Sequence, residues 1–441
     1  MLSLRPYFQR TAILTLILFG LAFGLLSCGG SNNNTRTLPP VVHRALISNY
    51  TNSNVTVADT DRNVLSTLVG GVSGSPGLMA LSSDRKFTLA FAPVNNSVLL
   101  ISNAQQAAVG GAILGDPNAL PNQTVSILLT VDDGTILAAI PNEVVIGQAP
   151  GAVDVVSIGT SLARQPSIPL VSVRYLAATP NGNRVVAMSD TANNPANPTG
   201  PSGRVWILTP SLIGSGVQPY TEVSSPAFDH PVFALGSADN NFAYVLNCGP
   251  ECGGVQAGIV TIDLTSNTVM NTLAIPGGAT TAFVNGNTVY VAGTTPGTLC
   301  AGGSPTYCGT LTSVDLGSFT VQASVEITDG YHDRIALGAN NLLFVGSRGC
   351  SILALARGCL SLFDVTKPTT VAKVAVPAPF IQPAPDPGDD VTGIAPIRNK
   401  SEVYVIQGGE LIIYDTTTAV RKVQDNPPDI VGQAIDVKAL D

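Results

Sequence analysis

The feature that most constrains the fold of this chain is a repeated pattern of short apolar runs that end at clusters of Asn, Asp, Ser and Gly. Residues 45–91 show it first, with three alternating runs, ALISNY, NVTVAD and LMALSS, and a fourth, FTLAF. The clusters supply the side-chain hydrogen bonds and positive φ angles that tight turns require. Four short antiparallel strands in about fifty residues predict one sheet of a radial array, as in a β-propeller.

An outer hairpin recurs along the chain. Each copy is an apolar strand that ends in Asp or another turn residue, followed by a second strand. Eight copies can be placed, and they begin at Asn54, Asn96, Ala152, Gly203, Gly258, Thr310, Cys359 and Glu410. Their starts lie about fifty residues apart, which is a spacing typical of propeller repeats.

Inner hairpins lie between the outer ones, and seven of them are complete. Three contain strong hairpin-turn signals, at residues 132–134, 181–182 and 285–286. The eighth has to be composite, because the last apolar run, residues 430–437, and the first strand, residues 44–50, each lack a neighbour in sequence to pair with. Pairing these two runs closes the ring and leaves no unprotected sheet edge.

The sequence therefore predicts an all-β fold. Residues 43–441 form a β-propeller of four-stranded antiparallel blades, eight in number, with the two ends joined in one composite blade. Seven blades are the alternative, if one hairpin in the weakly patterned region 96–200 is an insertion.

The first 27 residues are predicted to be a lipoprotein signal peptide. Arg5 and Arg10 precede an apolar segment, residues 12–26. The segment Leu25-Leu26-Ser27-Cys28 resembles the lipobox of bacterial lipoprotein signal peptides. That resemblance implies cleavage before Cys28 and attachment of a diacylglyceryl group to its sulfur. An ordinary secretory signal with an incidental cysteine is the alternative.

The residues after the cysteine are predicted to be a flexible tether. Residues 28–42 would carry the lipid on Cys28, and the remainder has no apolar period and contains Gly, Asn and a Pro-Pro pair. The lipid is the predicted membrane contact. Gly29 rather than Asp follows the cysteine, which in lipoproteins implies sorting to the outer membrane of a Gram-negative host.

The six other cysteines fall into three close pairs, each between two apolar runs. The pairs are Cys248 with Cys252, Cys300 with Cys308, and Cys350 with Cys359. Three loops closed by local disulfides are the simplest interpretation, and they require an oxidising compartment. Each bond would contribute only about 2–3 kcal/mol, because the loops that it closes are short. A zinc site is the alternative, but no His lies at ligand spacing.

The repeat pattern resembles the YVTN type of β-propeller repeat. In that family a Tyr-Val-Thr-Asn strand precedes a hairpin of the form V-x-V-I-D-T-x-T-x-x-V and then a strand–turn–strand ending S-P-D-G-K. The matching segments are residues 46–49, 55–60 and 82–86, with weaker matches at 260–269, 285–291 and 411–416. The resemblance implies the fold and an envelope location, but not an activity, because the same blades serve binding proteins and enzymes. The Pro and Gly of the family's turn are mostly replaced here.

The charge of the chain excludes one class of partner. Charged residues make up 11% of the sequence, and the net charge is −8. Apart from the amino terminus there is no run of Lys or Arg, so the sequence lacks the basic surface that nucleic-acid binding requires.

Acidic residues occur in two kinds of place. Those at the outer turns are interpreted as turn-forming, with the carboxylate accepting a backbone N–H two residues on; they are Asp59, Asp263, Asp315, Asp364 and Asp415. Others lie in the segments that lead into inner strands, which pass over one face of a propeller near the axis, together with the cysteine loops. We expect them to belong to four consecutive blades, and they include Asp329, Asp386, Asp425 and Asp429.

This second group is the candidate site for a divalent cation or a polar ligand. Its predicted residues are Asp229, His230, His332, Asp333, Asp389 and Asp390. The alternative is that these side chains only cap backbone groups or face solvent.

The sequence predicts a binding or scaffolding role rather than catalysis. It contains a single Trp, Trp206, whereas quinoprotein propellers have one in nearly every blade, and it has no nucleophile elbow of a serine hydrolase. We therefore expect a non-catalytic envelope lipoprotein that has no cofactor and binds a protein or polysaccharide. The alternative is a metal-dependent, lactonase-like hydrolase that uses the Asp and His residues above.

Overall fold

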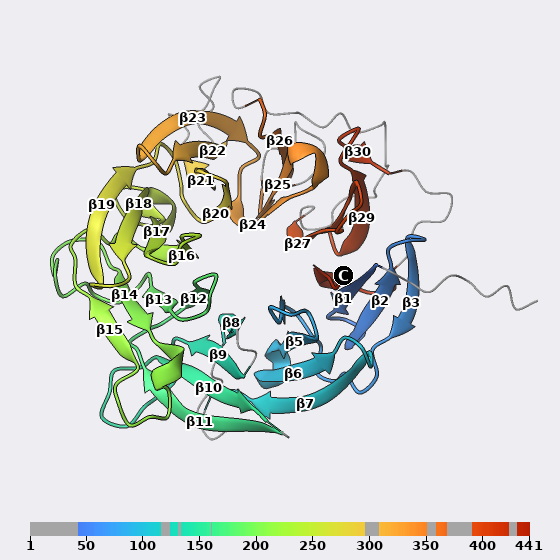
Figure 1. Ribbon diagram of the computed structural model, residues 1–441, viewed down its shortest axis with the longest axis horizontal. Helices are drawn as coiled ribbons and strands as arrows, with labels where there is room; N and C mark the ends of the chain where they lie inside the picture. Colours follow the sequence, from blue (N-terminus) through green and yellow to red (C-terminus); the bar gives the residue numbers. More distant parts are fainter. Residues whose placement is uncertain are drawn as a thin grey trace, which may run out of the picture. The chain divides into compact units, whose positions relative to one another are not determined.

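Short strands joined by tight turns make up most of the chain, because β-branched and apolar residues alternate with turn clusters throughout. The computed structural model describes residues 43–115, 124–130, 134–159, 161–295, 308–350, 359–367, 390–422 and 430–441. Eight antiparallel sheets surround one axis and form an eight-bladed β-propeller (Figure 1). The predicted all-β fold and the predicted number of blades are confirmed.

We number the blades in chain order and give each from its innermost strand outward. Blade 1 has β31 (Ala434–Ala439), β1 (Arg44–Asn49), β2 (Asn54–Asp59) and β3 (Val64–Leu68). Blade 2 has β4 (Met79–Leu81), β5 (Phe87–Ala92), β6 (Ser97–Ser102) and β7 (Ala107–Ile113). Blade 3 has β8 (Ser126–Leu129), β9 (Thr135–Ile140), β10 (Ala152–Ile158) and β11 (Leu162–Pro169). Blade 4 has β12 (Tyr175–Ala178), β13 (Val185–Ser189), β14 (Arg204–Leu208) and β15 (Tyr220–Val223).

The remaining blades follow the same order. Blade 5 has β16 (Pro231–Gly236), β17 (Phe242–Asn247), β18 (Gly258–Asp263) and β19 (Thr268–Ala274). Blade 6 has β20 (Thr281–Asn285), β21 (Thr288–Thr295), β22 (Cys308–Asp315) and β23 (Thr320–Ile327). The described part of blade 7 has β24 (Tyr331–Leu337), β25 (Leu342–Arg348) and β26 (Leu360–Asp364). Blade 8 has β27 (Val391–Pro396), β28 (Glu402–Gln407), β29 (Glu410–Asp415) and β30 (Val420–Arg421).

Among the connections that the structure describes, four contain single-turn 3₁₀ helices. They are η1 (Pro93–Asn95), η2 (Pro210–Leu212), η3 (Gly249–Cys252) and η5 (Ala339–Asn341). Within the described residues, no helix has the length and apolar character needed to cross a membrane.

The ring closes in blade 1, as predicted. Strand β1 pairs antiparallel with β31, and Ile47 lies opposite Val437. An ion pair between Arg44 Nε and Asp441 Oδ2, 3.0 Å apart, lies beside this pairing. Around the axis, every innermost strand contacts the next, from β31 through β4 to β27 and back to β31.

The hydrophobic core lies between neighbouring blades rather than at the axis. Between blades 4 and 5, Met188 and Ile207 pack against Val245 and Ile262. Strands of a propeller blade are covered on both faces by adjacent blades, so their central residues are apolar on both sides. The buried pattern of β9, in which five consecutive residues are buried, is an example.

The inner turns explain one of the recurring sequence signals. Ser82 Oγ donates to Asp84 Oδ1 at 2.8 Å and accepts a bond from Phe87 N at 2.9 Å. The same two bonds recur at the turns that begin at Thr179 and Ser237. A hydroxyl residue followed two positions later by Asp or Asn therefore builds this turn.

The outer turns use Asp in the way that the sequence indicates. Asp263 Oδ1 accepts bonds from Thr265 N at 2.7 Å and Ser266 N at 3.1 Å. Four residues after the Asp, the chain adopts the left-handed conformation, at Asn63, Asn267, Phe319 and Ala419. Asn tolerates that conformation, whereas Phe and Ala adopt it at a cost.

The antiparallel order of the strands gives the propeller two different faces. The turns within inner and outer hairpins lie on one, which we call the turn face. The loops between the two middle strands of each blade, and the segments that lead into each next blade, lie on the other, the loop face. Strand β1 is the second strand of its blade, so it starts on the turn face, and its first residue, Arg44, lies there.

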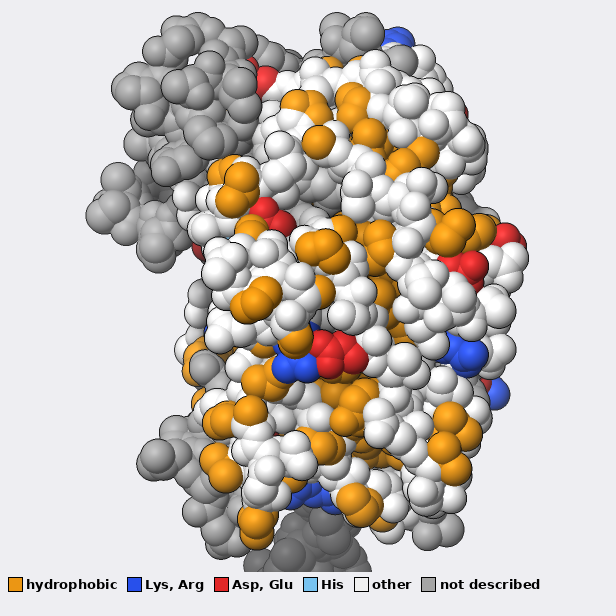
Figure 2. Space-filling model, turned by 90° about the vertical axis from the view of Figure 1, so that its left-hand side faces the viewer, with side chains coloured by type: hydrophobic (Ala, Val, Ile, Leu, Met, Phe, Trp, Pro, Cys, Tyr) orange, Lys and Arg blue, Asp and Glu red, His pale blue; other side chains and the backbone are white. Residues whose placement is uncertain are grey.

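Few charged side chains appear on the part of the surface that Figure 2 displays. Orange apolar side chains are scattered there among white ones, in agreement with a sequence in which only 11% of residues are charged. Arg204 pairs with Glu222, and its guanidinium lies 5.1 Å from the centre of the Trp206 ring. The only Trp of the chain thus supports one blade and does not recur around the ring.

Candidate functional site

The loop face carries the cysteines and the predicted site residues. Two of the predicted disulfides are confirmed: Cys248 bonds to Cys252 beside η3, and Cys350 bonds to Cys359. Both close loops between the two middle strands of a blade, in blades 5 and 7. Cys308, at the start of β22 in blade 6, is also disulfide-bonded, and Cys300 lies outside the described residues.

The acidic lead-in segments are not on four consecutive blades, contrary to the expectation. Asp229 and His230 precede β16 of blade 5, whereas Asp333 lies in β24 of blade 7 and Asp390 precedes β27 of blade 8. Blade 6 intervenes, and its lead-in, residues 275–280, contains no acidic residue. Asp386, Asp389, Asp425 and Asp429 lie outside the described residues.

Asp229 holds one disulfide loop in place. Its side chain is nearly buried, and Oδ2 accepts bonds from the backbone N–H groups of Val255 and Gln256, both at 2.8 Å. His230 Nδ1 lies 2.8 Å from Oδ1 of the same carboxylate. A Cβ at Gly254 would lie 1.9 Å from that Oδ1, so glycine is needed where the loop meets Asp229.

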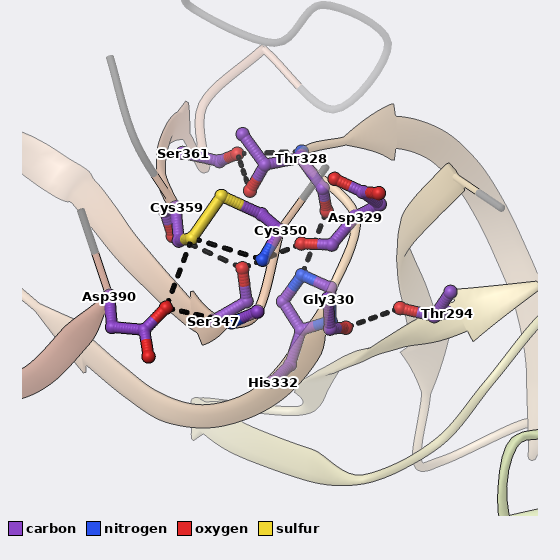
Figure 3. Close-up of a disulfide and its surroundings, with 11 residues drawn as sticks. Thr294, Thr328, Asp329, Gly330, His332, Ser347, Cys350, Cys359, Ser361 and Asp390 are labelled. Atoms are coloured by element: carbon purple, nitrogen blue, oxygen red, sulfur yellow. Dashed lines mark hydrogen bonds between the residues drawn. A yellow bond between two sulfur atoms is a disulfide. The ribbon is translucent and has the colours of Figure 1, made fainter. Parts of the chain in front are cut away.

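Asp390 has the same role beside the other disulfide, as Figure 3 shows. Its Oδ1 accepts a bond from Gly349 N at 2.7 Å and lies 3.7 Å from Cys359 Sγ. Ser347 Oγ donates to the carbonyl of Asp329 at 2.7 Å. The lead-in segments of blades 7 and 8 are thus joined to the loop that carries Cys350 and Cys359.

His332 is fully buried behind this loop. Its Nε2 donates to the carbonyl of Thr328 at 3.0 Å (Figure 3), and Nδ1 has no hydrogen-bond partner within the described chain. Burial disfavours the charged imidazolium and lowers the pKa of His332 to about 4. The ring is therefore neutral at neutral pH.

Asp333 is a predicted site residue in which one carboxylate oxygen has no hydrogen-bond partner within the described residues. Its Oδ2 lies 2.5 Å from Arg348 Nη2 and 3.3 Å from Arg334 Nη1. Its buried Oδ1 has no hydrogen-bond partner in the part of the chain that the structure describes. Burial raises the pKa of this carboxyl in spite of the two arginines, and the nearby charge of Asp390 acts in the same direction.

Two tyrosines that sequence reasoning missed meet over the inner strands. Tyr175 begins β12 of blade 4 and Tyr331 begins β24 of blade 7, and each phenol affects the pKa of the other, so the two side chains lie near each other. Tyr175 OH also lies 3.3 Å from Asp190 Oδ2. Burial raises the pKa of Tyr175 to about 12 and that of Tyr331 further, so both phenols keep their protons. Because blades 5 and 6 lie between them, this contact spans the channel mouth.

Glu251 is a second residue that was missed. It lies inside the loop closed by Cys248 and Cys252, and its Oε2 accepts a bond from Thr294 N of blade 6 at 2.8 Å. Burial raises the pKa of Glu251 to about 7, and its charge in turn raises the pKa of Tyr331. A Glu between two close cysteines, and a Tyr at the first position of an inner strand, were the signals available in the sequence.

Three carboxylates of the loop face bind backbone groups of its loops. The carboxylates of Asp229, Glu251 and Asp390 accept bonds from backbone N–H groups of the disulfide loops or of the neighbouring blade. Among the described residues, no group of three or more His, Cys, Asp or Glu side chains is placed to hold a metal ion. These contacts fix the disulfide loops of blades 5 and 7 to the neighbouring blade or to the lead-in segments.

Comparison with known proteins adds information on the fold. No protein-family model matches the chain. No curated protein sequence matches it. The solved structure titled dihydro-heme d1 dehydrogenase NirN in complex with DHE is similar with a TM-score of 0.60 at 12% identity, over 91% of this chain and 76% of that one. A functionally unknown protein from Desulfotomaculum acetoxidans DSM 771 is similar with a TM-score of 0.51 at 15% identity, over 75% of this chain and 94% of that one.

At such low sequence identities, the similarity supports the fold but gives no information on activity. The eight sheets around one axis and the similarity to solved structures agree, and they identify this chain as a β-propeller protein.

Proposed function

We propose that this chain is a lipoprotein of the bacterial cell envelope whose propeller binds another molecule without catalysing a reaction. A lipid on Cys28 anchors it, through residues 28–42, to the outer membrane, where it faces the periplasm or the exterior. The signal-like segment before Cys28 and the YVTN-type repeat pattern support this location. The disulfides support an oxidising compartment.

One observation carries the binding role: side chains that could serve as metal ligands hold the loops of the loop face instead. Asp229 joins the loop of Cys248 and Cys252 to the lead-in of blade 5. Asp390 joins Gly349 to the lead-in of blade 8. Loops fixed before binding lose less conformational entropy when a partner binds, which favours a recognition surface. The partner is a protein or a polysaccharide, because the net charge of −8 opposes binding to nucleic acid.

A metal-dependent, lactonase-like hydrolase is the second candidate, with a divalent cation at the channel mouth. It is favoured by Asp333, whose buried Oδ1 has no hydrogen-bond partner within the described residues. That NirN is a dehydrogenase also means that a similar propeller can carry chemistry. The predicted ligands are Asp229, His230, His332, Asp333, Asp389 and Asp390. Asp229 and His230 lie in the lead-in of blade 5, apart from His332 and Asp333 of blade 7 and Asp390 beside blade 8, so a single cation could not use all of them.

Partner contact can be tested by photo-crosslinking in living cells. A photo-reactive amino acid replaces Val255, which is exposed in the disulfide loop of blade 5, in the full-length protein. The matched control is Val217, which is 59% exposed on the turn face. We expect a discrete adduct with an envelope protein or polysaccharide from position 255 and none from position 217. Equal labelling from both positions, or no adduct from either, would contradict a binding role of the loop face.

The two candidate functions differ in their need for metal. We expect elemental analysis of the purified protein to find no stoichiometric divalent metal, and a chelator to leave its melting temperature unchanged. A bound metal that is lost in the Asp333→Asn variant, together with a fall in melting temperature on chelation, would favour the hydrolase.

The anchor is tested separately. Cells fed with labelled fatty acid should label the wild-type protein and leave the Cys28→Ala variant unlabelled. Fractionation should place only the wild type in the outer membrane. Labelling of the variant would overturn the predicted attachment site.

A further inference from the structure

The positive charges of the turn face gather around the point where the chain enters the propeller. His43 leads into β1 on this face, so the residues before it join the propeller there. The turns of blades 8, 1 and 2 surround that point. They comprise residues 43–44, 59–64, 82–87, 102–107, 397–402, 415–422 and 438–441, all within the described chain, and we call them the basic arc.

The basic arc has an excess of positive charge, although the chain as a whole is acidic. Its ranges contain nine Lys and Arg residues and six Asp and Glu residues, whereas the net charge of the chain is −8. The described turns of blades 3–7 have the opposite balance, with Arg184 and Lys367 against four Asp residues. Asp132 and Asp133, in the inner turn of blade 3, lie outside the described residues. The turn face is therefore polarised, and its positive side surrounds the entry of the chain.

Contacts between turns make the basic arc one surface across three blades. Arg85, in the inner turn of blade 2, donates to carbonyl groups at and just after the end of β31. Arg44 Nη1, at the start of β1, donates to the carbonyl of Asn103 in the outer turn of blade 2 at 3.1 Å. Lys400, in the inner turn of blade 8, donates to the carbonyl of Thr60 in the outer turn of blade 1.

The acidic residues of the arc do not neutralise its cations. Glu402 pairs with two ammonium groups, those of Lys400 and Lys422. Arg398 is exposed and has no ion pair within the described residues. The side chain of Lys86 is 75% exposed although it pairs with a carboxylate. Anionic groups from outside the protein can therefore reach several of these cations.

We propose that the basic arc binds the anionic phospholipid headgroups of the membrane that holds the anchor, so that the turn face lies on the bilayer. This inference rests on the proposed lipid at Cys28. The predicted tether between that lipid and the propeller, residues 29–42, spans about 20 Å on average if it is a flexible chain of fourteen residues. Strands of six residues separate the two faces by about 20 Å. A tether that leaves from the turn face is therefore too short, on average, to pass around the ring and bring the loop face to the membrane.

Electrostatics favours the same orientation. Each Lys or Arg beside anionic headgroups strengthens binding to the bilayer. At physiological ionic strength, charges are screened over about 8 Å, so acidic residues on the loop face hardly oppose a contact made by the arc. An acidic protein or polysaccharide has the same sign of charge, but the chain itself holds only the membrane beside the arc. The loop face with its disulfide loops then points away from the bilayer, where a partner can reach it.

The test uses the full-length, lipid-modified protein in vesicles of phosphatidylethanolamine, with or without phosphatidylglycerol. A photo-reactive amino acid replaces Ser83, which is exposed in the inner turn of blade 2. The matched control places it at Ile146, which is 98% exposed on the loop face. After illumination, we expect phospholipid adducts from position 83, several-fold more of them when phosphatidylglycerol is present, and none from position 146.

A second variant connects the adduct with the charge of the arc. Arg85→Gln with Arg398→Gln removes two positive charges. It should reduce the phospholipid adduct from position 83 by about tenfold in vesicles with phosphatidylglycerol, and have no effect in vesicles without it. Arg184→Gln, on the turn face of blade 4, should leave the amount unchanged. Circular dichroism checks that each variant is folded.

Several outcomes overturn the proposal while the anchor stands. They are no phospholipid adduct from position 83, equal yields from positions 83 and 146, or a yield that depends neither on phosphatidylglycerol nor on the two arginines. In cells, an adduct from position 83 with protein or polysaccharide and none with phospholipid would also overturn it.

Failure of the anchor itself is recognised separately, because Cys28 then takes up no labelled fatty acid. In that case the full-length protein is sedimented with the same vesicles. Binding to vesicles with phosphatidylglycerol that is lost in the Arg85→Gln, Arg398→Gln variant would support the arc as a membrane-binding surface. Absence of binding would overturn it.

Discussion

The side-chain carboxylates of this protein have different roles, and these roles depend on how deeply each group is buried. At the exposed outer turns, backbone N–H groups hold the pKa of Asp263 and Asp315 below its usual value. Asp229 makes similar bonds in a nearly buried setting, where it joins two loops rather than shaping one turn. For Asp333 and Glu251, burial outweighs the bonds and raises the pKa.

A stabilising substitution follows from the outer turn of blade 8. Ala419 has a φ of 56°, in the left-handed region, where the equivalent residues of blades 1 and 5 are Asn63 and Asn267. Asn adopts this conformation at lower cost than Ala. We expect Ala419→Asn to raise the free energy of unfolding by about 0.5–1 kcal/mol. Urea denaturation measures the change, and a loss of stability would contradict the argument.

Glu251 makes stability depend on pH. Burial raises its pKa from 4.5 to about 7, so the folded protein binds this proton more tightly than the unfolded chain does. The contribution of Glu251 to the free energy of unfolding therefore falls as pH rises from about 4.5 through about 7. Gln cannot titrate and still offers an oxygen to Thr294 N. The free energy of unfolding of Glu251→Gln, relative to that of wild type, should therefore increase by on the order of 2 kcal/mol when the pH is raised from 5 to 8.

The control for this prediction is Asp263→Asn. Its pKa is lowered, so its titration ends below pH 5 and its difference from wild type should not change between pH 5 and pH 8. Urea denaturation at both pH values tests the two variants together. If the gap between Glu251→Gln and wild type stays constant, the carboxyl is not protonated in the folded state.

At the scale of elements, the loops rather than the strands distinguish one blade from another. The strands were predictable because turn chemistry is local: the hydroxyl of Ser82 or Ser237 and the Asp two residues later fix a hairpin wherever they occur. The composite blade was predictable as well, since the strand at residues 434–439 pairs with residues 44–49.

The site was less predictable, for a physical reason. Residues on lead-in segments could be assigned to the loop face, but their contacts depend on how the ring spaces its blades. Tyr175 of blade 4 and Tyr331 of blade 7 lie near enough to affect each other's pKa, although no local pattern connects these two blades. Similarly, the bonds of Asp229 and Asp390 to the loop backbone could not be predicted from the sequence, because every residue except Pro has a backbone N–H group.

The disulfide of blade 7 should stabilise the protein modestly. Cys350 and Cys359 are nine positions apart, so their bond removes little entropy from the unfolded chain. Replacing both by Ala should lower the free energy of unfolding by about 2–3 kcal/mol and leave the propeller folded. Denaturation in urea measures the loss. Reductant should then have less effect on the variant than on wild type, and an unfolded variant would show that the bond is required for the fold.

At the scale of the whole molecule, stability depends on one strand pairing. Val437 is fully buried in β31, opposite Ile47, and it packs in the cluster that joins blades 8 and 1. No other strand can fill this position, because every other innermost strand belongs to a blade of its own.

A charge at the closing strand should therefore open the ring. We expect Val437→Asp to lower the free energy of unfolding by about 3 kcal/mol or more, because it buries a carboxylate without a partner. The matched control is Val217→Asp, at an exposed position, which should change stability by less than about 0.5 kcal/mol. Both values come from urea denaturation, and equal stabilities would show that closure contributes little.

The pairing of β1 with β31 also sets the order of events during biosynthesis. Strand β1 waits for a partner almost 400 residues later in the chain, so the ring cannot be completed before residues 434–439 have been synthesised. A product truncated before residue 434 keeps an unpaired edge on β1, and open edges of this kind recruit other chains into aggregates. The synthesis of β31 is thus the step that covers this edge and removes a site of aggregation.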